Sequence, residues 1–153
     1  MIALTEGGYM RNFGIIMMSH GEYAKATLGS LEMIAGHQDG VIALELDVNK
    51  SSDQFKAELV ESIASLRKDY EHLLVLCDLY GGTPFNTVLT SLMEGENYVA
   101  FSGFNLPVAL ATSLSGELDQ EGIKSLVKTT LIDSIFDLTE LSTQDQETND
   151  GVL

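Results

Sequence analysis

The sequence predicts an α/β fold, in which a doubly wound, mainly parallel sheet of four strands carries helices on both faces. Short runs rich in apolar residues have the length and composition of strands, at 13–18, 41–46, 73–77 and 98–102. After each run, apolar residues recur at helical spacing. The connections are short, and strands that alternate with helices in this way form parallel sheets. Right-handed crossovers then place helices on both faces of the sheet.

The first strand follows residues 1–11, which contain two glycines and no sustained periodicity, so we interpret them as a leader or extension. The strand runs into the tripeptide Ser19, His20 and Gly21. Apolar residues at helical spacing after this turn predict a helix that ends at Gly36, a residue suited to a C-cap. His20 therefore lies at the carboxyl end of a predicted parallel strand.

The second strand, 41–46, leads through a loop to a helix that Ser51 or Ser52 would cap and that ends near Lys68. The third strand, Leu73–Cys77, is apolar throughout. An unbroken apolar run of this length is typical of a strand buried on both faces of a parallel sheet. The third strand is therefore predicted to be covered on both faces of the sheet.

The third strand ends on the carboxylate of Asp78, and Gly81 and Gly82 then permit a turn. Thr83 is a good N-cap, and Pro84 suits the first helical position, where its missing N–H costs nothing. A helix N-terminus is therefore predicted beside the carboxyl end of a strand. In open α/β sheets ligands bind at this edge, and the free amides and dipole of the helix favour an anion such as phosphate.

The fourth strand, 98–102, leads to a helix that again starts at a proline, Pro107. A further helix covers roughly 120–132, and the short apolar segment Ile135–Leu138 has the composition of an edge strand. The segment 139–153 is polar and acidic and has no Lys or Arg, so we expect a disordered tail.

Composition restricts the function classes. The chain has 153 residues and a formal net charge of −15, from 8 Lys and Arg against 23 Asp and Glu, which argues against a nucleic-acid surface. The acidic surface favours either a basic protein partner or simple solvation. A single cysteine inside a strand and no secretory signal favour the reducing cytoplasm. No apolar run approaches the ~20 residues of a membrane span. Motifs for zinc, dinucleotide or ATP binding are missing, so we expect neither metal nor cofactor.

If the first and third strands are neighbours, a histidine, a carboxylate and helix-terminal amides converge at one edge of the sheet. This combination suits a phosphoryl group carried on His20, with Asp78 bonded to one ring nitrogen so that the other keeps its lone pair. The other interpretation of Asp78 is that it caps the turn or the helix. The other interpretation of His20 is a structural role, because an isolated histidine is more often structural than functional.

These residues carry a resemblance to a known family. Met18-Ser19-His20-Gly21, Leu28, Met33–Gly36 and above all the segment 78–86 resemble the IIA component of the mannose/fructose/sorbose family. This family belongs to the bacterial phosphoenolpyruvate-dependent sugar phosphotransferase system. The resemblance runs from about residue 12 to 138, which implies a IIA domain over 12–138 between the leader and the acidic tail. The segment 78–86 is highly specific, whereas Ser-His-Gly alone would be a weak signal.

The resemblance implies a cytoplasmic phosphohistidine relay protein associated with a membrane permease. Such a protein takes a phosphoryl group from the phosphocarrier HPr and passes it to a IIB domain, which phosphorylates sugar entering through a IIC/IID pair. It implies catalytic roles for His20 and Asp78, with the phosphoryl group on the ring nitrogen far from the backbone. It also implies a homodimer in which the C-terminal strand, Ile135–Leu138, exchanges between subunits.

The remaining site residues are assigned by their position beside this pair. Ser19, Gly21, Gly82 and Thr83 are predicted to approach the phosphoryl oxygens, and Gly81 to serve the turn. Two neighbouring residues are less definite. Tyr80 is expected to contact a partner protein, and Asn86 is expected either to pack within the helix or to lie at the edge of the site.

Three other functions stay open. The phosphotransferase subunit of dihydroxyacetone kinases also carries a histidine after its first strand, but the segment 81–86 departs from its usual pattern. A regulatory module could sense phosphorylation without relaying it, although the chain shows no DNA-binding or ATPase module. Flavodoxin-like cofactor binding is compatible with the fold only.

Overall fold

The computed structural model describes residues 10–149 and confirms the predicted parallel sheet. All strand pairs are parallel, and the strands lie in the order β2-β1-β3-β4. The strands are β1 (Phe13–His20), β2 (Val41–Leu46), β3 (His72–Cys77) and β4 (Val99–Ser102). The helices are α1 (Tyr23–Ala35), α2 (Ser52–Leu66), α3 (Thr83–Met93), α4 (Leu106–Ser113), α5 (Gln120–Asp133) and α6 (Leu138–Asn149).

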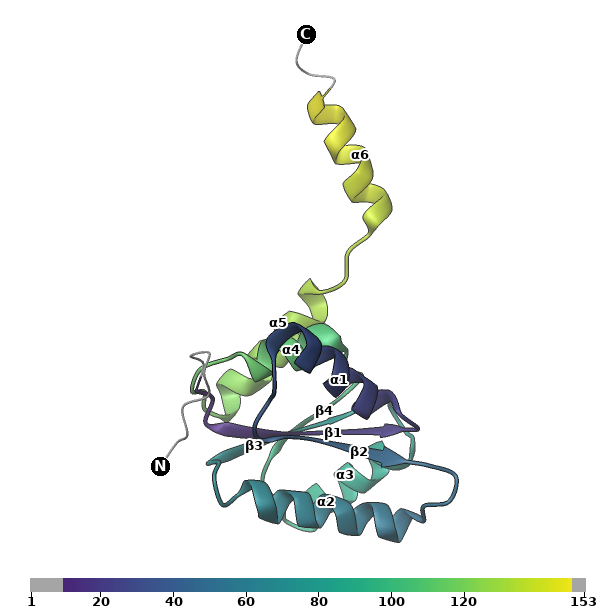
Figure 1. Ribbon diagram of the computed structural model, residues 1–153, viewed down its shortest axis with the longest axis vertical. Coiled ribbons are helices and arrows are strands. Elements are labelled where there is room, and N and C mark those ends of the chain that lie inside the picture. Colours follow the sequence, from purple (N-terminus) through teal and green to yellow (C-terminus); the bar gives the residue numbers. More distant parts are fainter. Residues whose placement is uncertain (1–9, 150–153) are drawn as a thin grey trace.

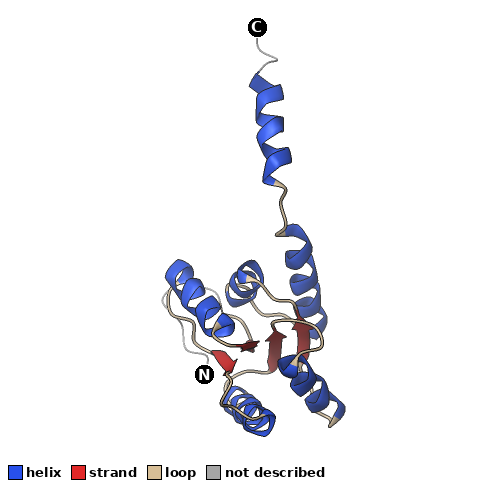
Figure 2. Cartoon of the chain, turned by 90° about the vertical axis from the view of Figure 1, so that its right-hand side faces the viewer, coloured by secondary structure: helices blue, strands red, loops and turns tan. Residues whose placement is uncertain are grey.

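Helices cover both faces of the sheet, as Figures 1 and 2 show. Helices α1, α4 and α5 lie on one face, and α2 and α3 lie on the other. Side chains of β1 alternate between the two cores: Ile15 and Met17 pack beneath the first group of helices, and Ile16 and Met18 beneath the second. Because both faces are covered, β1 and β3 are apolar and almost entirely buried.

Polar side chains fix where several helices begin. Ser51 and Gln54 form a capping box at α2, in which the Gln54 N–H donates to Ser51 Oγ and the Ser51 N–H donates to Gln54 Oε1. Asn105 caps α4 by accepting the N–H of Val108 at 3.0 Å. Asp119 caps α5 in the same way. Local sequence therefore determines where these helices begin.

Arg11 belongs to the fold, although it was predicted to end the leader. Its side chain is buried, and its guanidinium donates to the carbonyl oxygens of Phe13 at 2.9 Å and Ser113 at 3.2 Å and to that of Asp39. These bonds join the start of β1 to the end of α4 and to the loop before β2. The rest of the predicted leader, residues 1–9, lies outside the described residues.

The C-terminal part differs from the prediction. Residues 135–137 form no strand, and Leu138 begins α6. Figure 1 shows this segment leaving the body of the molecule. Its backbone therefore does not pair with an edge strand of the sheet in the same chain. Exchange with a second subunit stays a prediction.

The tail expected to be disordered forms helix α6 as far as Asn149. Asp137 starts this helix, because its Oδ1 accepts the N–H of Thr139 at 2.8 Å and that of Glu140 at 3.3 Å. No glycine or proline interrupts the sequence of α6. None of the described helices is long and apolar enough to cross a membrane.

Candidate active site at the carboxyl edge of the sheet

The topology brings the ends of β1 and β3 together. The chain passes from β1 to β2 on one side and then returns to place β3 on the other side of β1, so the strand order reverses between β1 and β3. Ligands bind at such a switch point in open α/β sheets. Met18 pairs with Cys77 in the register, which leaves His20 and Asp78 just beyond the last paired residues.

His20 and Asp78 are in direct contact. The ring Nδ1 of His20 lies 2.8 Å from Oδ2 of Asp78, and the backbone N–H of His20 donates to the same oxygen at 2.8 Å. The other carboxylate oxygen, Oδ1, accepts the N–H of Leu79 at 2.9 Å. The structure therefore brings together the two residues predicted to be catalytic.

This contact defines the tautomer of the imidazole. A carboxylate accepts hydrogen bonds, so Nδ1 carries the proton and Nε2 of the neutral ring keeps its lone pair. The Asp78 side chain is only 10% exposed, whereas that of His20 is 45% exposed. A nucleophilic nitrogen is thus accessible while the carboxylate behind it is shielded.

Gly82 lies against the edge of the His20 ring. A Cβ atom at Gly82 would lie 2.6 Å from Cε1 and 3.2 Å from Nε2 of His20. The backbone of Gly82 is in the extended region, with φ −80°, so glycine is required here for space and not for conformation. The ring therefore faces the N-terminus of α3.

The N-terminus of α3 has no side-chain cap. The N-cap is Gly82 and not Thr83, which is the first residue of the helix and precedes Pro84. Within residues 10–149, the N–H groups of Gly82, Thr83 and Phe85 have no acceptor. Because glycine has no side chain to satisfy them, these amides are free to bind an anion in front of His20.

Two predicted site residues are engaged elsewhere. Ser19 is fully buried, and its Oγ accepts the N–H of Ala24 at 2.7 Å and donates to the carbonyl oxygen of Gly21 at 3.4 Å. The N–H of Gly21 donates to the carbonyl oxygen of Leu46 at 2.8 Å. The Ser19 hydroxyl and the Gly21 amide therefore hold the β1–α1 turn, and we assign neither a phosphoryl contact. Gly21 has φ +52°, which accounts for glycine at this position.

The turn before α3 forms the rim of the site. Tyr80 is 80% exposed, and its ring lies 4.9 Å from that of Phe85. Asn86 donates from Nδ2 to the carbonyl oxygen of Gly81 at 3.4 Å, which ties the first turn of α3 to the glycine turn. Gly81 has φ +81°, in agreement with the turn role predicted for it.

Tyr23, which starts α1 three residues after His20, was not among the residues predicted for the site. Its hydroxyl donates to the carbonyl oxygen of Phe104 at 2.8 Å, and the two rings lie 5.0 Å apart. Burial, and secondarily the charge of Asp78, raise the pKa of Tyr23 above its ordinary value. The signal in the sequence was an aromatic residue at the helix start directly after the histidine turn.

The other histidines do not share this setting. His37 is exposed, with Nδ1 3.0 Å from Glu32 Oε1 and Nε2 3.2 Å from Asp39 Oδ1. His72 is the first residue of β3 and lies at the opposite edge of the sheet. His20 is therefore the histidine at the carboxyl edge.

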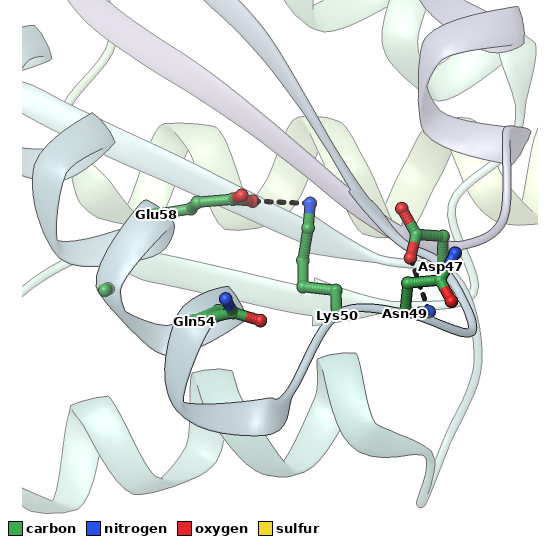
Figure 3. Close-up of a pocket in the computed structure, with 6 residues that line it drawn as sticks. Asp47, Asn49, Lys50, Gln54 and Glu58 are labelled. Carbon is green, nitrogen blue, oxygen red and sulfur yellow. Dashed lines mark hydrogen bonds and ion pairs between the residues drawn. The ribbon is translucent and has the colours of Figure 1, made fainter.

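A hollow of about 440 Å³ lies beside the end of β2 but does not include His20 or Asp78. Figure 3 shows its lining, where Lys50 Nζ contacts Glu58 Oε2 at 2.9 Å and the Asn49 N–H donates to Asp47 Oδ1 at 2.7 Å. The cation of this hollow is already paired, so we assign it no role in the site.

Comparisons with known proteins identify the family of the chain. The model of the EIIA-man family, described as "PTS system fructose IIA component", matches residues 14–131. The fructose-specific EIIA component of Bacillus subtilis (strain 168) is 26% identical over 96 residues, which cover 63% of this chain and 65% of that protein. The mannose-specific EIIAB component of Escherichia coli (strain K12) is 25% identical over 126 residues, which cover 73% of this chain and 39% of that protein. The chain thus matches less than two thirds of the length of these curated relatives.

Solved structures of phosphotransferase-system IIA proteins are similar to this chain over nearly the whole length of the solved chains. The phosphotransferase system component EIIA from Streptococcus agalactiae is 30% identical with a TM-score of 0.74, and the match covers 84% of this chain and 98% of that chain. The mannose/sorbose-specific IIA subunit from Enterococcus faecalis is 26% identical with a TM-score of 0.65, covering 81% and 92%. The chain therefore belongs to the EIIA-man family of phosphotransferase-system IIA components.

Proposed function

We propose that the protein is a phosphohistidine relay, which accepts a phosphoryl group on Nε2 of His20 and then passes it on. The observation that carries this proposal is the 2.8 Å contact between His20 Nδ1 and Asp78 Oδ2. That contact keeps the proton on Nδ1, so that the lone pair of Nε2 is available beside the uncapped N-terminus of α3.

The chemical step needs no proton transfer at His20. The lone pair of Nε2 attacks the phosphorus atom of a phosphohistidine donor, and the donor's N–P bond breaks with its electron pair returning to the donor ring. Asp78 stabilises the positive charge that the phosphorylated imidazole acquires. In this proposal the amides of Gly82, Thr83 and Phe85, which have no acceptor within residues 10–149, bind the phosphoryl oxygens. Handing the group on is the same displacement with the acceptor as nucleophile.

Membership of the family supports the partners that we propose. The donor is HPr and the acceptor is a IIB domain or protein, beside a membrane IIC/IID pair that the protein reaches from the cytoplasm. The name of the Escherichia coli relative, a mannose-specific EIIAB component, supports a IIB acceptor. We further propose a homodimer, formed partly through the segment after α5.

Phosphoryl transfer from phosphoenolpyruvate, with enzyme I and HPr supplied, tests the first half of the relay. We expect one acid-labile, base-stable phosphoryl group per chain, which His20→Ala abolishes and which His37→Ala and His72→Ala retain. Label that persists in His20→Ala would contradict the assignment.

A chase with unlabelled IIB tests the second half. The relay predicts that IIB removes the label from the protein at the rate at which IIB becomes labelled. A phosphorylated protein that IIB leaves unchanged would instead support a module that senses phosphorylation.

A further inference from the structure

The loop between β4 and α4, residues 103–105, is fixed beside the His20–Asp78 pair. The N–H of Gly103 donates to the carbonyl oxygen of Cys77 at 2.9 Å, and Cys77 immediately precedes Asp78. Gly103 has φ +81°, which lets the chain turn away from β4 at this point. One end of the loop is therefore bonded to the strand that carries Asp78.

Tyr23 holds the middle of the same loop from the other side of the site. Its hydroxyl donates to the carbonyl oxygen of Phe104 at 2.8 Å, and the two rings pack at 5.0 Å with an angle of 42° between their planes. Tyr23 starts α1 directly after the turn that follows His20. The loop is thus bonded both to the exit of β1 and to the exit of β3.

The middle and the end of the loop are anchored by burial and hydrogen bonds. Phe104 is 3% exposed within the core. Asn105 accepts the N–H of Val108 at 3.0 Å and donates from Nδ2 to Ser134 Oγ at 3.1 Å, so it is tied to α4 and to the end of α5. A loop with these anchors can transmit a fixed position to the groups that it contacts.

The charge of Asp78 acts on Tyr23, although its effect is smaller than that of burial. The pKa of Tyr23 is raised first by burial and then by the negative charge of Asp78. The Asp78 side chain is 10% exposed, so groups beside it help to keep water from the carboxylate. A hydrogen bond to a carboxylate is stronger where water is excluded.

We propose that Tyr23 is a positioning residue for phosphoryl transfer, which clamps the β4–α4 loop through Phe104 and so holds Asp78 in its bond to His20. The inference rests on the proposed function for its effect on transfer. Tyr23 itself contacts neither the phosphoryl group nor the attacking nitrogen. Its hydroxyl points to a backbone carbonyl, so its loss should alter the geometry of the pair and leave partner binding unchanged.

The test compares Tyr23→Phe with Tyr98→Phe. Both variants keep the ring and lose one hydroxyl-to-carbonyl bond, since the Tyr98 hydroxyl donates to the Val88 carbonyl oxygen at 3.2 Å. Tyr98 directly precedes β4, at the opposite edge of the sheet from His20. The control therefore reports the effect of a lost structural bond far from the site.

Two quantities are measured in folded protein: the single-turnover rate of phosphorylation over a range of HPr concentrations, and the NMR resonance of the His20 Nδ1 proton. For Tyr23→Phe we expect the saturating rate to fall about tenfold, less than the 10²-fold that a misplacement of about 1 Å can cost. The HPr concentration at half-maximal rate should stay unchanged. The Nδ1 proton should exchange faster with water, and Tyr98→Phe should change neither quantity.

Three results would overturn the inference: an unchanged rate and resonance in Tyr23→Phe, equal changes in both variants, or a change confined to the half-saturating HPr concentration. Failure of the proposed function has a different signature, because the wild type itself would then take no label on His20. The Nδ1 resonance would still report in that case whether Tyr23 positions the pair.

Discussion

One oxygen of Asp78, Oδ2, accepts both the backbone N–H and the ring Nδ1–H of His20, each at 2.8 Å. The two bonds fix the ring relative to its own backbone, so the imidazole cannot turn without breaking a charge-assisted hydrogen bond. The second oxygen is held by the N–H of Leu79 at 2.9 Å, which orients the carboxylate in turn. The His20 ring is therefore held in position by a single side chain, which directly follows the neighbouring strand.

Asp78→Asn should slow phosphoryl transfer by about 100-fold, the loss that misplacement of a reacting group can cause. The amide removes the negative charge and can bond to either tautomer of His20, so the proton no longer has a fixed place on Nδ1. Single-turnover phosphorylation by HPr measures the loss. Asp47→Asn, which removes an exposed charge from the loop after β2, is the matched control. Transfer at the wild-type rate in Asp78→Asn would reduce Asp78 to a turn cap.

Gly82→Ala should displace the His20 ring, because the new Cβ would lie 2.6 Å from Cε1. Its φ of −80° suits alanine, so we expect a folded protein whose phosphorylation rate falls at least about tenfold, given the steep dependence of transfer on position. Gly29→Ala is the control, since nothing lies within 4 Å of a Cβ there. It should leave the rate unchanged and add up to about 1 kcal/mol of helix stability. Equal rates in both variants would show that contact with Gly82 does not position the ring.

Much of this site could be predicted from sequence, because two strong local patterns specify it. The buried strands and the helices after them implied a parallel sheet, and in such a sheet the residues that end β1 and β3 meet at one edge. The sequence did not show that β1 and β3 are neighbours, and the catalytic role of Asp78 came from the resemblance to the family. The conformation of the turns could not be predicted in the same way. The N–H of Gly21 donates to the carbonyl oxygen of Leu46, a residue of another strand. The N-cap of α3 is Gly82, where Thr83 had been predicted.

Contacts distant in sequence also escaped prediction. Tyr23 and Phe104 are 81 positions apart, and no periodic pattern links them. The segment after α5 was predicted to be a strand on its apolar composition. In the structure Asp137 starts a helix instead, because a strand requires a partner edge and a capped helix satisfies its own backbone.

The exposed apolar residues after α5 should join two subunits. Ile135 is 80% exposed, Phe136 66% and Leu138 73%, which together form an unpartnered apolar segment. Light scattering at micromolar concentration should give the mass of a dimer, and deletion from Ser134 onward should give a monomer. Double substitution of Phe136 and Leu138 by serine should weaken the dimer, whereas a matched substitution of the exposed Val48 should not. A wild-type monomer, or a deletion variant that stays dimeric, would contradict this interface.

The acidic charge of the chain should accelerate association with a basic donor. Opposite charges steer an encounter, and salt weakens the steering as the Debye length shortens from ~10 Å at 0.1 M to ~3 Å at 1 M. We expect the second-order rate of phosphorylation by HPr to fall severalfold over this range, while the saturating rate changes little. Rates that do not depend on salt would show that the net charge of −15 serves only solubility.

Alkaline pH should destabilise the protein through Cys77. Burial, followed by the charge of Asp78, raises the pKa of this thiol from 9.0 to about 11. The folded state therefore retains the proton between pH 9 and 11 while the unfolded chain loses it, so stability is full below pH 9 and falls as pH rises to 11. The loss should be on the order of 2 kcal/mol, since one pKa unit corresponds to about 1.4 kcal/mol. Urea unfolding at each pH measures this loss of stability. In Cys77→Ala, stability should decline less steeply with pH. The remaining decline would come from other groups, including Tyr23 and Tyr98, whose pKa values are also raised. The same slope in both proteins would mean that the thiol does not contribute.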